Sequence, residues 1–168
     1  MSAVAEDANE AHDGLAQLRA MLSGGLKAPI GRTLGFELVE VERGRVVFEG
    51  APDRSVYNPL GAVHGGYAAT LLDSACGIAV HSALGANRGH TTLELKISYL
   101  RGLSDRSGTV RATGRAVSVG RRVAFADATL HDGEGRLCAT ATSTLLVFDV
   151  EADARGALQP DPVPGEGK

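Results

Sequence analysis

One carboxylate stands out in a long helical segment of this sequence. Asp73 is the only acidic residue between Gly65 and Leu84. An aspartate is ionised near pH 7, so it can attack a carbonyl carbon or take a proton from water. Eight residues earlier, the sequence Val63-His64-Gly65-Gly66 leads into the same segment. The first N–H groups of a helix are unpaired and carry partial positive charge, which suits an anion or a developing oxyanion. The glycine pair alone is weak evidence, because it could simply turn a loop into a helix.

The spacing of these two features restricts how they can work together. Eight residues along one helix span about 12 Å. A carboxylate that attacks a carbonyl must lie about 3 Å from its carbon. Asp73 therefore cannot act on a carbonyl held at Gly65 of the same chain. If both act on one substrate, we expect two antiparallel helices from two subunits to lie side by side.

The segment from Gly65 to Leu84 predicts a helix with two different sides. At about 100° per residue, small and polar residues fall in one stripe and apolar residues fall opposite. The stripe consists of Gly66, Tyr67, Thr70, Asp73, Ser74, Gly77 and His81. A solvated stripe normally carries long charged residues, and this one has none. We therefore expect another helix or a ligand to pack closely against it.

The rest of the chain predicts the elements that must position this helix. A short helix is expected over residues 11–22, where leucines recur at helical spacing. A loop rich in turn residues covers 52–63, and residues 131–136 (HDGEGR) predict a hairpin turn. In residues 92–99, Leu93, Leu95, Ile97 and Tyr99 alternate with Thr92, Glu94, Lys96 and Ser98, which is typical of a strand. Strands are predicted over 33–44, 45–52 (the two joined at Arg43-Gly44), 91–101, 108–120, 121–132 and 136–148.

Composition predicts one globular domain with two extensions. The 168 residues include 17 Lys+Arg and 20 Asp+Glu, a net charge of -3, and 43% are hydrophobic. We expect a flexible head with a short helix over 1–28, the domain over 29–150 and a disordered tail over 151–168. One helix cannot cover both faces of about six strands, so an oligomer is expected to bury the second face.

The same composition argues against several classes of partner. The slight acidity and the 4% aromatic content argue against a nucleic-acid binder. No apolar stretch is long enough to span a membrane, and the acidic start has no signal-peptide pattern. Cys76 and Cys138 make no disulfide framework or metal spacing, so we expect both to be buried and the protein to be cytoplasmic. No metal motif and no Gly-x-Ser-x-Gly elbow is present.

The run Asn58-Pro59-Leu60-Gly61-Ala62-Val63-His64-Gly65-Gly66, then Leu72-Asp73, then TTLELKISYLR resembles the hotdog-fold acyl-CoA thioesterases. Within them it is most similar to the phenylacetate-degradation and 4-hydroxybenzoyl-CoA thioesterase branch, over residues 33–148. The resemblance implies an α+β fold, with an antiparallel sheet of about six strands wrapped around one long helix. It also implies hydrolysis of an acyl-CoA thioester without a cofactor, in homodimers that pair into homotetramers.

The resemblance implies a role for each matching residue. The Gly65 N–H would bind the thioester carbonyl oxygen, and Asp73 of the other subunit would act as general base or nucleophile. Its short side chain leaves room for a water, which favours the base. Asn58 would position the carbonyl or the water, and His64 would shape the loop by hydrogen bonding. Thr92, or Thr91 if the register differs by one residue, would hold the attacking water.

The remaining predictions concern substrate contacts. Gly66, Tyr67, Thr70 and the loop 53–62 are expected to line the substrate pocket. Arg121 and Arg122 are favoured for the phosphates of coenzyme A, because adjacent cations beside a glycine turn can fork onto phosphate. Arg88, in the loop after the helix, and Arg101, at the end of a strand, are weaker candidates.

The other histidines and two other functions fit the sequence less well. His81 is expected to be structural, and His12, His90 and His131 are expected at the surface. Two alternative functions stay open at this point: a non-catalytic acyl-CoA-binding protein of the same fold, and a hotdog dehydratase or hydratase. The second is disfavoured, because that chemistry pairs a histidine with an acid in a motif that this sequence lacks.

Overall fold

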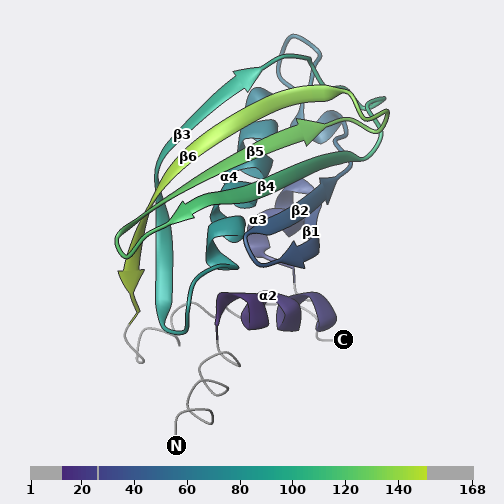
Figure 1. The fold of residues 1–168 in the computed structure, drawn as a ribbon. Coiled ribbons are helices and arrows are strands. Elements are labelled where there is room, and N and C mark those ends of the chain that lie inside the picture. Colours follow the sequence, from purple (N-terminus) through teal and green to yellow (C-terminus); the bar gives the residue numbers. More distant parts are fainter. Residues whose placement is uncertain (1–12, 26, 151–168) are drawn as a thin grey trace, which may run out of the picture.

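A six-stranded antiparallel sheet curves around one long helix in the computed structural model, which describes residues 13–25 and 27–150 (Figure 1). The strand order is β1-β2-β4-β5-β6-β3. The strands are β1 (Phe36–Glu42), β2 (Arg45–Gly50), β3 (Arg88–Tyr99), β4 (Val110–Val119), β5 (Val123–His131) and β6 (Leu137–Asp149). The helices are α2 (Gly14–Ser23), α3 (Pro29–Leu34), the short 3-10 helix η1 (Arg54–Val56) and α4 (Gly65–His81). The predicted α+β architecture is confirmed.

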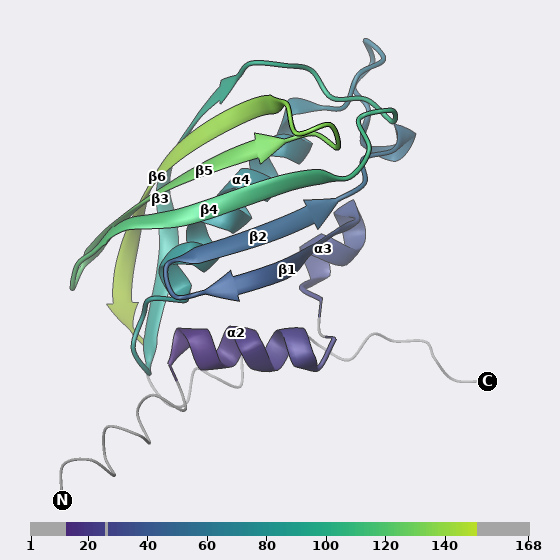
Figure 2. The ribbon, with the colours of Figure 1, turned by 45° about the vertical axis from the view of Figure 1, so that its right-hand side comes forward.

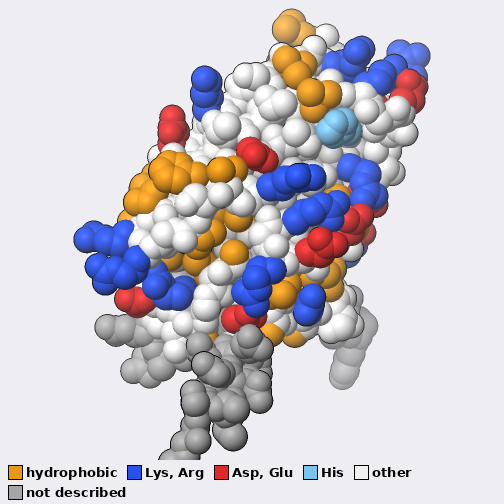
Figure 3. All heavy atoms as spheres, in the orientation of Figure 1, with side chains coloured by type: hydrophobic (Ala, Val, Ile, Leu, Met, Phe, Trp, Pro, Cys, Tyr) orange, Lys and Arg blue, Asp and Glu red, His pale blue; other side chains and the backbone are white. Residues whose placement is uncertain are grey.

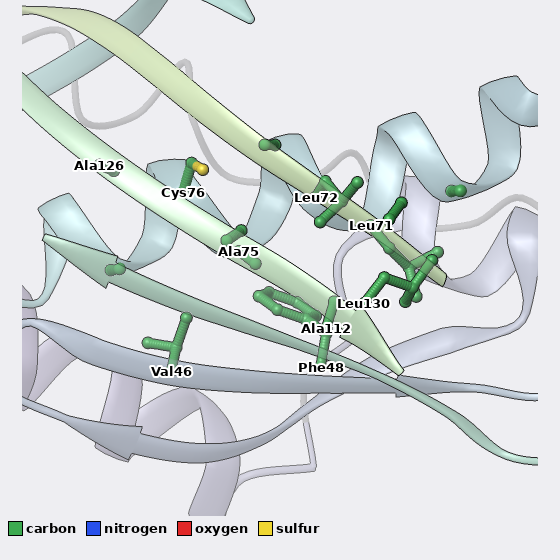
Figure 4. Packing of buried hydrophobic residues seen from close by; sticks show 14 of the residues in the cluster. Val46, Phe48, Leu71, Leu72, Ala75, Cys76, Ala112, Ala126 and Leu130 are labelled. Atoms are coloured by element: carbon green, nitrogen blue, oxygen red, sulfur yellow. The ribbon is translucent and has the colours of Figure 1, made fainter. Parts of the chain in front are cut away.

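The core lies between helix α4 and the concave face of the sheet. Figure 4 shows side chains of α4 and of the strands meeting in this space. The contact includes Leu71, Leu72, Ala75 and Cys76 of α4 and Val46, Phe48, Ala112, Ala126 and Leu130 of the sheet. Gly114 of β4 lets the helix approach closely, because a Cβ there would lie 2.1 Å from the carbonyl oxygen of Ala75. The predicted burial of Cys76 and Cys138 is confirmed.

The chain before β1 differs from the prediction. The strand expected from residue 33 begins at Phe36, because residues 29–34 form helix α3. Pro29 suits the first turn of a helix, and Gly35 ends it with a φ of 69°, a conformation that glycine adopts readily. The predicted turn at Arg43-Gly44 is confirmed, with a φ of 76° at Gly44.

Helix α2 lies across the end of the molecule that also holds α3 and the β1 edge of the sheet (Figure 2). Asp13 caps its N-terminus, and Leu15 and Leu18 are buried. The helix predicted over 11–22 is thus observed from Gly14 to Ser23. The expectations for residues 1–12 and for the tail 151–168 lie outside the described residues. Among the described helices, none combines the length and the apolar character that a membrane span requires.

Among the strands of the described residues, β3 forms one edge of the sheet and pairs only with β6. It begins at Arg88, three residues before the prediction, because α4 ends at His81 rather than at residue 84. Thr92 pairs with Leu145 and Glu94 with Thr144, so Leu93 is an extra residue, a β-bulge. The bulge overturns the predicted alternation: Thr92 shares the inner face with Tyr99, and Leu93 is 59% exposed.

The outer face of the sheet carries apolar side chains at one end. Figure 3 shows hydrophobic side chains gathered there, with basic side chains beside them. The exposed apolar residues there are Val123 and Phe125 of β5, Phe148 of β6 and, at a bulge of β4, Val117. Phe125 is 49% exposed although its neighbours Ala124 and Ala126 are buried, as expected for alternate faces of a strand. That an oligomer covers this face stays a prediction.

Candidate active site

The start of helix α4 leaves one backbone donor free. His64 is the N-cap residue, and its Nδ1 accepts a 2.8 Å hydrogen bond from the Gly66 N–H. The Tyr67 N–H donates to the His64 carbonyl oxygen at 3.0 Å. Among the described residues, the Gly65 N–H has no partner. It is therefore the donor available to a ligand oxygen, whereas the amide of Gly66, also predicted to contact substrate, is already bonded.

The structure brings Asp73 and Thr92 together. The Thr92 hydroxyl donates a 3.0 Å hydrogen bond to Asp73 Oδ1. Asp73 is half-buried in the middle of α4, and Thr92 lies on the inner face of β3. Thr91 pairs with Leu146, whereas Thr92 pairs with the buried Leu145. Thr91 therefore points to the outer face of the sheet. Of the two threonines, the geometry therefore selects Thr92 as the partner of Asp73.

Gly65 and Asp73 do not converge within one chain. Both belong to helix α4, so about 12 Å of helix separates them. A single protomer therefore presents an oxyanion donor and a carboxylate that cannot reach one carbonyl. The stripe of small and polar residues is exposed at Gly66 and half-buried at Thr70 and Ser74.

The loop before α4 is held by Asn58. Its Oδ1 accepts hydrogen bonds from the N–H groups of Leu60 (2.9 Å) and Ala62 (3.2 Å). Asn58 N–H also donates to the Ala62 carbonyl oxygen at 2.8 Å. Because Oδ1 is engaged, only the amide Nδ2 of Asn58 is left to donate to a substrate oxygen. This arrangement fits positioning of a carbonyl better than acceptance of a hydrogen bond from a water.

Tyr67 and Thr70 were both predicted to line the substrate pocket, and of these two only Thr70 is accessible. Thr70 is half-buried and its hydroxyl donates to the Gly66 carbonyl oxygen at 2.9 Å. The placement of Tyr67 on the open stripe is wrong: it is 3% exposed and belongs to the core. Its hydroxyl reaches Gly50, where a Cβ would lie 2.3 Å away. The position of Tyr67 borders the apolar side of the helix, and its side chain joins the core cluster that also contains Phe36.

A cavity of about 220 Å³ adjoins the free amide. It lies between the start of α4, the end of β3 and the β5–β6 hairpin. Its lining is largely apolar and includes Val63, Ala68, Leu103, Leu130 and Cys138. Tyr99 and Arg101 also border it, and the Tyr99 hydroxyl donates to the Gly65 carbonyl oxygen at 3.0 Å. The sequence pattern did not identify Tyr99, because strand alternation marked it only as an apolar-face residue.

The predicted phosphate-binding arginines lie far from the free amide. Arg121 and Arg122 are exposed in the β4–β5 turn. Arg88 donates to the Arg121 carbonyl oxygen and pairs with Asp149 at 3.2 Å. Arg88, predicted in a loop, is the first residue of β3. Tyr99, at the other end of that strand, donates a hydrogen bond to Gly65. Twelve residues of strand, with a path of at most about 35 Å, lie between these two contacts.

His90 is not the surface histidine that was predicted. It lies in β3, and its Nε2 would be 3.0 Å from a Cβ on Gly77 of α4. Its ring centroid is 5.6 Å from that of His81. Burial, and then repulsion from His81, lower the pKa of His90 to about 4. His81 lies 3.3 Å from Gln17 Oε1, which agrees with a structural role.

The remaining reactive groups give no competing centre. Burial raises the pKa of the Cys76 thiol to about 12, so it stays protonated and unreactive. Over residues 13–25 and 27–150, no three His, Cys, Asp or Glu side chains gather in a way that could hold a metal ion.

Comparisons with known proteins agree on one family. The sequence profile of the thioesterase superfamily matches residues 60–139. The chain is 27% identical over 115 residues to a 1,4-dihydroxy-2-naphthoyl-CoA hydrolase of Listeria monocytogenes, covering 68% of this chain and 92% of that one. A thioesterase family protein from Silicibacter pomeroyi is 30% identical, with a TM-score of 0.67 and coverage of 73% and 90%. A Streptococcus mutans protein solved bound to acetyl CoA is 29% identical, with a TM-score of 0.63 and coverage of 70% and 91%.

Proposed function

Because the chain belongs to the thioesterase superfamily and is an enzyme of that kind, we propose that it hydrolyses an acyl-CoA thioester to the free acid and coenzyme A. Water adds its oxygen to the carbonyl carbon, the carbon–sulfur bond breaks, and the thiolate of coenzyme A takes up a proton. The observation that carries the proposal is the pair of groups on α4: a Gly65 N–H that has no partner among the described residues, and an Asp73 carboxylate oriented by Thr92.

The Gly65 N–H acts where negative charge develops. A fixed backbone donor binds the oxygen of the tetrahedral intermediate more strongly than the neutral carbonyl, and so lowers the barrier. The Asn58 Nδ2 group is the second donor, because its Oδ1 is held by the loop. The adjoining cavity then receives part of the acyl group.

Asp73 takes the proton from the attacking water. Thr92 occupies Oδ1, which leaves Oδ2 for the water. Attack by Asp73 itself, through an acid anhydride that water then opens, uses the same atoms. Single-turnover hydrolysis in heavy-oxygen water separates the two routes, since label in Asp73 contradicts a role as base alone.

The complete site forms between two chains. Since Gly65 and Asp73 are separated along one helix, the carbonyl held by one protomer meets Asp73 of a second protomer. The open stripe of small residues and the free edge of β3 favour such a pairing of helices and strands. Two dimers then pair through the apolar outer face of the sheet. In this assembly Arg121 and Arg122 contact the phosphates of coenzyme A from the second chain.

Thiol release from acyl-CoA tests the function. The panel contains benzoyl-, phenylacetyl-, 1,4-dihydroxy-2-naphthoyl- and medium-chain acyl-CoA, since the branch that the sequence resembles and the Listeria relative point to aryl acyl groups. Asp73→Asn should lower kcat at least about 100-fold, as expected for loss of a general base. Asp127→Asn, on the outer face of β5, is the matched control and should retain activity. Tight acyl-CoA binding without turnover in the wild-type chain would instead establish a binding protein.

A further inference from the structure

Tyr99 is packed directly onto Gly65. It is the last residue of β3, and its hydroxyl donates a 3.0 Å hydrogen bond to the Gly65 carbonyl oxygen. The ring fills the space that a Gly65 side chain would take, since an added Cβ would lie 3.3 Å from Cζ of Tyr99. The side chain is still 55% exposed, so this contact is not a by-product of core packing.

The first turn of α4 needs such a contact. Gly65 and Gly66 have no side chains to restrict their backbone, and glycine is the most flexible residue in a helix. An oxyanion donor contributes most when it is fixed before the reaction begins. His64 Nδ1 holds the Gly66 N–H, and the Tyr99 hydroxyl holds the Gly65 carbonyl oxygen. The two contacts together fix the turn and leave the Gly65 N–H free.

The bulge at Leu93 lets one strand make two contacts with the helix. Residues an odd number apart point to opposite faces of a regular strand. Thr92 and Tyr99 are seven residues apart, yet Thr92 pairs with Leu145 and Tyr99 with Ala139, both on the inner face. The extra residue at the bulge shifts the alternation by one position, so that both side chains point to the inner face. As a result, β3 touches Asp73 through Thr92 and Gly65 through Tyr99.

We propose that Tyr99 is a positioning residue for the reaction, and that strand β3, through its bulge, aligns the oxyanion amide and the carboxylate of each chain. This inference rests on the proposed function. The ring of Tyr99 borders the cavity beside Gly65, but its hydroxyl is bonded to the Gly65 carbonyl oxygen and acts through the backbone of Gly65. The loss of that hydroxyl should therefore reduce stabilisation of the transition state without weakening the binding of the substrate in its ground state.

The kinetic test removes only the hydroxyl. Tyr99→Phe should lower kcat about three- to tenfold, the effect of one neutral hydrogen bond, while KM stays within about twofold. Ser98→Ala removes a hydroxyl one residue away on the outer face and should leave both constants unchanged. An unchanged kcat in Tyr99→Phe, or a rise in KM alone, would overturn the inference.

A second readout needs no substrate. Hydrogen exchange of the Gly66 amide, followed by NMR, should be faster in Tyr99→Phe than in the wild type or in Ser98→Ala, because the turn opens more often. Equal exchange rates overturn the role of Tyr99 while the proposed function stands. Absence of thioesterase activity in the wild-type chain overturns the proposed function and, with it, the catalytic meaning of the contact.

Discussion

The Thr92 hydroxyl and the Asp73 carboxylate are joined by a 3.0 Å hydrogen bond that links the edge strand to the middle of the central helix. The donor is a short, β-branched side chain with few rotamers, so it holds Oδ1 in one direction. Among the described residues, no hydrogen bond to the second carboxylate oxygen is found. The bond therefore orients the carboxylate without blocking it.

Thr92→Val should reduce activity less than Asp73→Asn does. The valine keeps the shape of the side chain and removes the donor, so we expect kcat to fall about three- to tenfold. Thr91→Val alters the outer face of the same strand and serves as the control in the same thiol-release assay. Equal effects of the two substitutions would show that the bond to Asp73 has no catalytic weight.

Gly65→Pro tests the free amide itself. Proline is tolerated at the first position of a helix, and His64 already has the extended backbone (φ -62°, ψ 136°) that precedes proline. The variant should fold and lose about 100-fold or more of kcat, because the donor is gone. Gly65→Ala adds a Cβ but keeps the N–H, so the difference between the two variants isolates the donor. The idea fails if both variants have the same kcat.

Mixing two inactive variants tests the shared site. Asp73→Asn and Gly65→Pro chains, unfolded and refolded together, should recover about a quarter of the wild-type activity, because half of the dimers then hold one intact site of two. Each variant refolded alone is the control. If the mixture stays inactive although mixed dimers form, Gly65 and Asp73 do not meet across subunits.

His90 should make the fold sensitive to mild acid. Its folded-state pKa of about 4 is below the ordinary value of 6.5, so the unfolded chain binds the proton first. The stability that this group contributes is therefore complete above about pH 6.5 and is lost as the pH falls toward 4. Urea unfolding should show a loss on the order of 1–3 kcal/mol across this range.

The matched variants for this experiment are His90→Gln and His131→Gln. The first should reduce the change between pH 6.5 and 4, because one titrating ring is gone, while His81, whose pKa is also lowered by burial, still contributes. The second, at the end of β5, should leave it in place. Carboxylates such as Asp13 and Asp132, whose pKa values are lowered, act only at still lower pH. An unaltered pH profile in His90→Gln would refute the assignment.

Local periodicity predicted the main elements of the fold, whereas features that depend on tertiary contact were missed. Helix α4, the six strands and the neighbourhood of His64 and Gly65 could be located from glycine placement and from periods of 3.6 and 2. The inward turn of Tyr67 could not be predicted, because its angular position borders the apolar side and the space that its hydroxyl occupies beside Gly50 exists only in the folded chain. His90 was misplaced because its burial against Gly77 depends on which strand crosses the helix.

The bulge was hidden for a similar reason. Leu93 continues a perfect alternation in the sequence, so pattern alone places Thr92 on the outer face. The pairing with β6 determines the face instead, and that partner is about fifty residues away in the chain. Resemblance to a family supplied a role for Thr92, that of holding the attacking water, although the alternation placed this residue on the outer face; its hydrogen bond to Asp73 is seen only in the structure.

The extra residue at Leu93 also sets a rule for insertions and deletions in β3. Removing or adding one residue between Thr92 and Tyr99 would turn one of the two side chains away from the helix. A change of two residues would keep both side chains facing inward but would shift one of them by about 6.6 Å along the strand. The length of this stretch, rather than the identity of the residues within it, is then what a viable variant of this chain must preserve.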